Sequence, residues 1–99
     1  MQVVWSPRAI DRAIEIATFI AQDNPAAARE WVERLFGHVD TQLAAFPLSG
    51  NPARDMDTDN ARKLVFESYR VFYDVGDAVE ILTARRGSGL IGANELRIG

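Results

Sequence analysis

Two segments of the chain, residues 69–75 and 79–84, are rich in β-branched and aromatic residues, which is typical of β-strands. Arg70 lies near the end of the first segment that is far from the turn, with Tyr69 beside it, and Arg85 and Arg86 directly follow the second segment. Guanidinium groups bind phosphate and carboxylate through paired hydrogen bonds. We therefore take four residues as candidates for binding a target: Tyr69, Arg70, Arg85 and Arg86.

The turn between the two segments determines how these residues meet. Gly76 and Asp77 favour a two-residue hairpin turn with glycine first. Counting back from such a turn pairs Arg70 with Thr83 and places Arg85 diagonal to Arg70 on the same face, with Tyr69 and Arg86 on the other face. A longer turn or a bulge would change this pairing. Solvated strand charges that keep the sheet soluble are the alternative to an anion site.

Other kinds of site lack the residues that they need. The absence of cysteine excludes disulfides, thiol nucleophiles and thiolate metal sites. Residues 55–59 begin like a calcium loop, but Asn60 stands where the turn needs glycine and Phe66 where the loop needs a bidentate glutamate. His38, the one histidine, has no ligand partner at helical spacing, and no Gly-x-Ser-x-Gly motif is present. We expect neither a metal nor a cofactor.

Two helices are expected to position the strands. Ser6 before Pro7, and Asn24 before Pro25, combine an N-cap residue with a proline at the first helical position. The second helix is predicted to run for about twenty residues and to end at Pro47. The tight break between the helices predicts a helical hairpin. Apolar residues recur at helical spacing in both, namely Ile10, Ala13, Ile14, Ala17, Ile20 and Ala21, then Ala28, Trp31, Val32, Leu35, Val39, Leu43 and Phe46.

Trp31 and Leu35 lie on the apolar stripe of the second helix. A tryptophan in such a stripe is more often packed in a core than functional. If part of the helix pair stays exposed, the same residues would suit the amphipathic helix of a partner. Trp31 and Leu35 are therefore the candidate residues for binding a partner.

The order of elements predicts an α+β fold. An N-terminal strand in residues 2–5 precedes the helical hairpin, which packs on one face of an antiparallel sheet; residues 48–61 form a loop. A C-terminal three-strand meander then takes residues 64–66, 69–75 and 79–84. A chain of 99 residues supports one core, so we expect one domain over residues 1–99. Residues 87–99 are predicted to form a further strand or a mobile tail.

Composition narrows the classes of partner. The net charge of −3 and the pI of about 5.0 argue against a broad surface for nucleic acid, because phosphate contacts need a basic excess. The apolar stretches are too short to span a membrane. The N-terminus lacks a basic segment followed by an apolar run, as a secretory signal would have. We therefore expect a cytoplasmic protein that binds neither a membrane nor, directly, nucleic acid.

Nearly all of the chain resembles the ParE/RelE toxin superfamily, and it resembles the ParE branch more than the RelE branch. No single motif carries this resemblance; the order and spacing of several segments do. These segments are residues 4–9 (Val-Trp-Ser-Pro-Arg-Ala), 20–28, 46–50 (Phe-Pro-Leu-Ser-Gly), 62–65, 69–75 (Tyr-Arg-Val-Phe-Tyr-Asp-Val) and 79–82.

The resemblance implies the toxin of a type II toxin–antitoxin system, with a helical hairpin packed on an antiparallel sheet. It implies a ParD-like antitoxin as partner, for which Trp31 and Leu35 are the candidate contacts. ParE-type toxins inhibit DNA gyrase, whereas RelE-type toxins cleave mRNA in the ribosome. An exposed sheet edge would also allow self-association, so a homo-oligomer stays open.

The match to the cleaving relatives is incomplete. Arg70 takes the place of their arginine in the Tyr-Arg pair, and Lys63 falls on their second strand. No tyrosine follows Tyr73, and Arg85-Arg86 comes two or three positions before the late arginine of that group. The first hypothesis is therefore a gyrase inhibitor without enzymatic activity. The alternatives are a RelE-type ribonuclease, in which Arg70 would be catalytic, and a degenerate toxin that retains only antitoxin binding.

Overall fold

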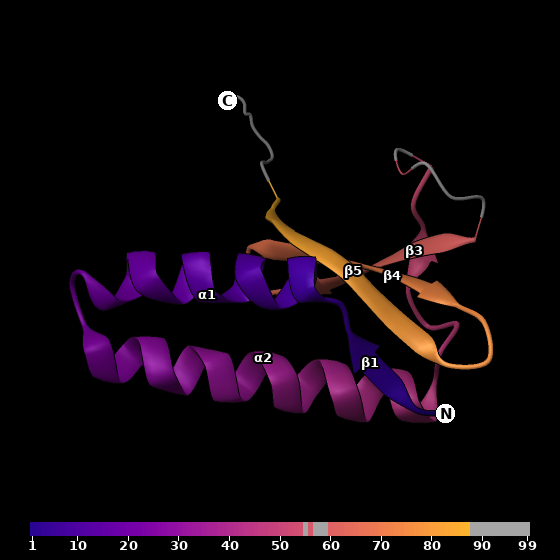
Figure 1. The fold of residues 1–99 in the computed structure, drawn as a ribbon, viewed down its shortest axis with the longest axis horizontal. Helices are drawn as coiled ribbons and strands as arrows, with labels where there is room; N and C mark the ends of the chain where they lie inside the picture. Colours follow the sequence, from indigo (N-terminus) through magenta and orange to yellow (C-terminus); the bar gives the residue numbers. More distant parts are fainter. Residues whose placement is uncertain (55, 57–59, 88–99) are drawn as a thin grey trace.

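The computed structural model describes residues 1–54, 56 and 60–87 of the chain. Two long helices lie side by side and run in opposite directions, and the strands of one sheet cross beside them (Figure 1). The chain enters α1 directly from a short strand at the N-terminus (Figure 1). In chain order the elements are β1 (Val3–Trp5), α1 (Pro7–Ala21), α2 (Pro25–Ala45), β2 (Asn51–Pro52), β3 (Ala61–Phe66), β4 (Tyr69–Val75) and β5 (Val79–Arg86).

Both helices begin where the sequence predicts. The Ser6 hydroxyl accepts a hydrogen bond from the Ala9 N–H at 3.1 Å, and the Asn24 side chain accepts one from the Ala27 N–H at 3.0 Å. A proline opens each helix, where the missing N–H leaves no intrahelical bond unmade. The α-helical hairpin is thus confirmed. Neither helix in the described part of the chain has the length and apolar composition to cross a bilayer.

The sheet has the strand order β1-β5-β4-β3-β2. Strands β3, β4 and β5 form the predicted antiparallel meander. β1 pairs in parallel with β5, so the sheet is mixed rather than purely antiparallel. The short strand β2 pairs with β3 inside the segment expected to be a loop, and β3 begins three residues earlier than predicted.

The register predicted between β4 and β5 is wrong, for two local reasons. Val75 pairs with Val79, so the turn holds three residues rather than two. A bulge then skips Leu82, because Tyr73 pairs with Ile81 and Phe72 with Thr83. Each irregularity shifts the pairing by one residue. Beyond the bulge the total shift of two leaves Arg70, Thr83 and Arg85 on their predicted face but brings Arg70 directly opposite Arg85. Between the turn and the bulge the shift is one, so Ile81 faces the core beside Tyr73 rather than lying opposite Phe72 as predicted.

The helices cover one face of the sheet, and the core lies between them. Residues of both helices and of β3, β4 and β5 form this cluster, with Tyr73, Leu35, Leu43 and Ile81 among its largest fully buried side chains. We call the opposite side of the sheet the outer face. In a smaller cluster on the outer face, Phe72 packs with Ala53 and Met56, which follow β2, and with Ala61 at the start of β3.

Residues that lie opposite each other on neighbouring strands share a face of the sheet. On the outer face they form three rows that run across β3, β4 and β5. The first row holds Val65, Arg70 and Arg85; the second holds Lys63, Phe72 and Thr83; the third holds Ala61, Asp74 and Glu80. Val4 of β1 extends the third row beside Glu80.

Candidate functional site

Arg70 and Arg85 form the basic end of the outer face, and we call them the arginine pair. Both residues are exposed. The Arg85 guanidinium lies 5.1 Å from the ring centre of the buried Phe72, within the range of a cation–π interaction. A Cβ atom at Gly87 would lie 3.1 Å from Arg70 Nε, so the Arg70 side chain passes closely along that glycine. Two like charges directly opposite each other repel, so the pair is a concentrated positive site.

The outer face carries positive charges at the end with the arginine pair and negative charges further along the strands. The salt bridges between described residues are Arg12–Glu15 and Arg34–Glu67, and neither involves the pair. Lys63 adds a half-buried cation in the second row. Asp74 lies four residues beyond Arg70 on β4, and Glu80 lies opposite Asp74 on β5; we call these two residues the acidic row. At 3.2–3.4 Å per residue, the backbone positions of the two charged ends are about 13 Å apart.

The other two target-binding candidates lie on the helix side of the sheet. Tyr69 pairs with Arg86, and its ring packs against Trp31 with centroids 5.3 Å apart. The structure therefore brings Arg70 and Arg85 together on the outer face and separates them from Tyr69 and Arg86. This division follows the alternation of side chains along a strand.

The groups best suited to moving protons also lie away from the outer face. The chain has two tyrosines and one histidine. Tyr73 is buried in the main core, where its hydroxyl accepts a hydrogen bond of 2.9 Å from the Gly50 N–H. Burial raises the pKa of Tyr73, against smaller lowering effects of this hydrogen bond and of Arg62. His38 lies on α2 with its ring 5.6 Å from that of Phe66.

Trp31 and Leu35, the candidate contacts for a partner, are buried in the core. Their side chains are 3% and 0% exposed. Trp31 packs edge-on against Phe66 and Tyr69, two residues of the sheet. The structure therefore does not offer these two side chains to a partner. The reason is that α2 carries apolar residues on more than one side, and positions 31 and 35 are the ones that face the sheet.

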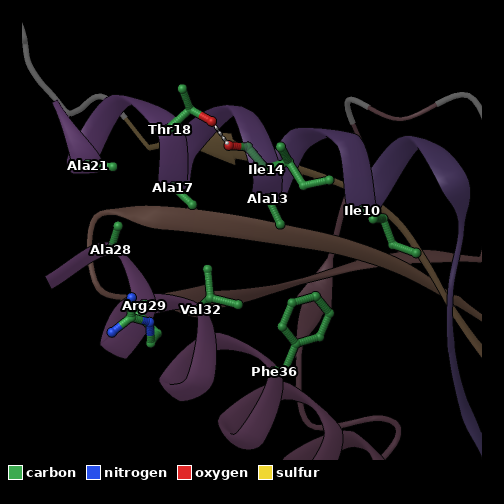
Figure 2. A pocket seen from close by; sticks show the side chains of 10 residues that line it. All are labelled: Ile10, Ala13, Ile14, Ala17, Thr18, Ala21, Ala28, Arg29, Val32 and Phe36. Atoms are coloured by element: carbon green, nitrogen blue, oxygen red, sulfur yellow. Dashed lines mark hydrogen bonds between the residues drawn. The ribbon is translucent and has the colours of Figure 1, made fainter. Parts of the chain in front are cut away.

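An apolar groove lies between the two helices instead, with a volume of about 370 Å³. In Figure 2, Val32 and Phe36 of α2 point toward α1, while Arg29 lies toward the end where the helices are joined. Ile10 and Ile14 of α1 are 40% and 56% exposed. We call this the hairpin groove; its lining residues are Ile10, Ala13, Ile14, Ala17, Thr18, Ala21, Ala28, Arg29, Val32 and Phe36.

Contacts with Trp5 hold Phe36, the groove residue furthest along α2, in place. The Phe36 ring packs against Trp5 with centroids 4.3 Å apart, and the Trp5 indole N–H donates to Asp40 Oδ1 at 2.8 Å. The sequence stripes contain most of the groove residues, but helical spacing alone does not separate the side facing the sheet from the side facing solvent. Among the described residues, no cluster of three or more histidine or acidic side chains could hold a metal ion.

One protein family and one curated relative match most of the chain. Residues 3–90 match the family described as the ParE toxin of the type II toxin–antitoxin system, parDE. A protein of Sinorhizobium fredii (strain NBRC 101917 / NGR234), named "Putative toxin Y4kP", is 39% identical over 84 residues, which are 83% of each chain.

Two solved structures share the fold. The chromosomal ParDE toxin–antitoxin system of P. aeruginosa gives a TM-score of 0.73 at 21% identity, covering 89% of this chain and 97% of the other. The RelBE2 toxin–antitoxin complex of Mycobacterium tuberculosis gives 0.56 at 22% identity, covering 86% and 88%. With the family match spanning most of its length, this chain belongs to the ParE toxin family of type II toxin–antitoxin systems.

Proposed function

We propose that this toxin inhibits DNA gyrase in the cytoplasm by protein–protein binding, without catalysis of its own. The observation that carries the proposal is the make-up of the outer face. Its described residues supply fixed cations, Arg70 and Arg85 above all, but neither a phenol nor an imidazole. Such a surface binds an anion and leaves it unchanged.

RNA cleavage needs groups that transfer protons as well as groups that bind the phosphate. Cleavage requires that a proton be taken from the attacking hydroxyl and that another be given to the leaving oxygen. Arginine stays protonated in proteins, so it holds a phosphate but does not exchange protons. The backbone positions of Asp74 and Glu80 lie about 13 Å along the strands from those of the arginine pair. Neither carboxylate forms a salt bridge with these arginines, so neither is placed as a base beside a phosphate that the pair would hold.

The test is a supercoiling assay with purified gyrase and relaxed plasmid. The toxin should inhibit supercoiling, and Arg70→Ala should fold normally by circular dichroism yet inhibit at least about tenfold more weakly, since a hydrogen bond to a charged group contributes about 1.5–3 kcal/mol. Cells expressing the toxin should filament with their mRNA intact. Normal supercoiling in the presence of excess folded toxin would refute the proposal.

One observation favours the ribonuclease as the second candidate. Lys63 lies on the outer face in the row next to the arginine pair, so three basic side chains share that face. Primer extension on mRNA from a ribosome-containing translation reaction tests this function. Cuts at A-site codons would establish it, and intact transcripts would exclude it. A toxin that affects neither gyrase nor mRNA, and causes no growth defect, would be the degenerate form.

We further propose that a ParD-like antitoxin neutralises the toxin by placing an amphipathic helix in the hairpin groove. Toxins of type II systems are paired with antitoxins, and both structural neighbours are toxin–antitoxin systems. The groove is lined almost wholly by apolar residues, with Arg29 at one end. It lies between two helices, where the apolar face of a third helix can pack. An acidic residue near the end of the antitoxin helix would complement Arg29.

A pair of substitutions on α1 tests this placement. Ile14 lines the groove and is 56% exposed; Phe19 is 64% exposed on the same helix and is not a lining residue. Ile14→Asp should weaken binding of the antitoxin at least about tenfold in titration calorimetry, since it introduces a charge into an apolar contact. Phe19→Asp should leave binding within about twofold. Equal effects of the two changes would place the antitoxin elsewhere.

A further inference from the structure

The outer face carries opposite charges at its two ends, and this pattern indicates what kind of partner it recognises. We infer that it binds an extended protein segment in which an acidic residue and a basic residue lie about 13 Å apart along the backbone. The carboxylate would meet the arginine pair, and the basic side chain would meet the acidic row. This inference rests on the proposed protein-binding function and specifies the target segment.

The basic end is arranged in advance for an oxyanion. The Arg85 guanidinium is held 5.1 Å from the ring centre of Phe72, which is itself 2% exposed. Arg70 passes along Gly87, where even a methyl group would press on it at 3.1 Å. Because both side chains are constrained by buried or backbone neighbours, they lose less rotamer entropy when an oxyanion binds. Two adjacent guanidinium groups can then share one carboxylate.

At the acidic end, two like charges also lie opposite each other on β4 and β5, but both are negative. Asp74 lies directly opposite Glu80 in the register of β4 and β5. Asp74 is held in place, since its carboxylate accepts the Val75 N–H at 3.2 Å. Glu80 is exposed, with the exposed Val4 of β1 beside it. Like charges directly opposite each other destabilise an isolated sheet. A partner that neutralises both ends would remove both penalties on binding.

The middle row separates the two charged ends. Phe72 and Thr83 are 2% and 3% exposed, and Phe72 packs with Ala53 and Met56 and lies under the Arg85 guanidinium. A segment that contacts both charged ends therefore passes over these covering residues rather than resting on the strands. The spacing of the two ends then becomes a specificity determinant.

The acidic row also explains why a protein is favoured over a nucleic acid. A nucleic-acid strand carries a phosphate at each nucleotide, about 3.4 Å apart along a duplex axis. A strand anchored at the arginine pair would bring further phosphates to Asp74 and Glu80 within the same 13 Å. The net charge of −3 adds to this repulsion. A protein segment can reverse its charge over that distance, whereas a phosphodiester backbone cannot.

The experiment is an NMR titration of the ¹⁵N-labelled toxin with three probes. The first is an extended, end-capped peptide with glutamate and lysine four positions apart, the second replaces the lysine by glutamate, and the third is hexauridylate. The first should shift the amides of residues 70–74 and 80–85 and bind at least fivefold more tightly than the other two. Equal or tighter binding of hexauridylate would assign the face to nucleic acid. Equal binding of the second peptide, or no shifts at millimolar peptide, would refute the inference.

Charge reversals on the toxin connect this test to its target. Arg70→Glu and Glu80→Lys should each reduce peptide binding and gyrase inhibition at least fivefold. Arg8→Glu, an exposed reversal on α1, should change neither. If the peptide binds but gyrase is unaffected by the wild-type toxin, the face recognises another protein and only the proposed target fails. If gyrase is inhibited equally by wild type and both reversals, the target stands and the inference fails.

Discussion

At the scale of single residues, the close approach of Gly50 to Tyr73 fixes the chain next to β2 onto the sheet. The Gly50 N–H donates to the buried Tyr73 hydroxyl at 2.9 Å. A Cβ atom at Gly50 would lie 2.5 Å from that hydroxyl and 2.6 Å from the Lys63 carbonyl oxygen. The second contact is with backbone, which has little freedom to move. Only glycine fits at this position.

Gly50→Ala should therefore destabilise the fold by about 1–3 kcal/mol through overpacking. The measurement is the free energy of unfolding in urea. Gly37→Ala is the matched control, because a Cβ atom at this position on α2 would meet nothing within 4 Å. There the methyl group should stabilise by about 0.5–1 kcal/mol, since alanine is the better helix former. Equal changes at both glycines would contradict the close approach.

The ionisation of Tyr73 predicts how stability depends on alkaline pH. Burial raises the pKa of Tyr73 above 10.0, the ordinary value for tyrosine. Above pH 10 the unfolded chain loses the phenol proton first, while the folded chain keeps it. The folded state then binds more protons than the unfolded state, so stability falls as pH rises from 10 through the folded pKa. Below pH 10 this group contributes no slope.

Tyr73→Phe isolates that contribution. At pH 8 the variant should be less stable by about 1–3 kcal/mol, because the buried Gly50 N–H loses its acceptor. Above pH 10 the wild type alone carries the Tyr73 penalty, so the difference between the two proteins should shrink. Urea unfolding at several values between pH 8 and 11 measures it. A difference that stays constant over this range would show that the Tyr73 pKa is not raised.

At the scale of elements, local sequence signals predicted most of the helices and strands, whereas pairing between distant strands was the feature least predictable from the sequence. The helix starts follow from residues next to each other in the chain, Ser6-Pro7 and Asn24-Pro25, so they could be identified directly. The parallel pairing of β1 with β5 joins segments more than seventy residues apart and has no local signal. The register error arose locally, because the turn holds three residues rather than two and a bulge skips Leu82.

The corrected register makes a prediction about β4 and β5. Because Arg70 lies directly opposite Arg85, Arg70→Glu should replace a repulsion by an attraction and stabilise the fold by about 0.2–1 kcal/mol. The same change should abolish inhibition of the target, so stability and activity move in opposite directions. Urea unfolding beside the supercoiling assay measures both. A loss of stability on Arg70→Glu would indicate that Arg70 has a structural role.

At the scale of the whole molecule, the fold stacks two candidate surfaces on either side of one core. The hairpin groove lies between the helices, and two of its lining residues, Ile10 and Ile14, are exposed. The outer face lies on the other side of the sheet, beyond the core. The sequence could identify the arginines, because strand alternation fixes their face. It could not identify the groove, because core and groove residues belong to the same helical stripes.

The separation of these surfaces predicts that toxicity and neutralisation can be lost independently. Ile14→Asp should remain toxic in cells even when a ParD-like antitoxin is co-expressed, since only the groove is changed. Arg70→Glu should be harmless yet still bind the antitoxin in a pull-down, since the outer face is changed and the groove is intact. Phe19→Asp should behave as wild type in both assays.

The separation of the two surfaces also predicts which part of the antitoxin is needed for neutralisation. An antitoxin helix seated only in the groove leaves the outer face uncovered, because the core and the sheet lie between them. A fragment limited to that helix should therefore bind the toxin without restoring supercoiling, and neutralisation should need a further segment that reaches the sheet. Complete neutralisation by the helix fragment alone would mean that the target contacts the hairpin rather than Arg70 and Arg85. Growth rescue with fragments of increasing length, in cells that carry the wild-type toxin, distinguishes the two arrangements.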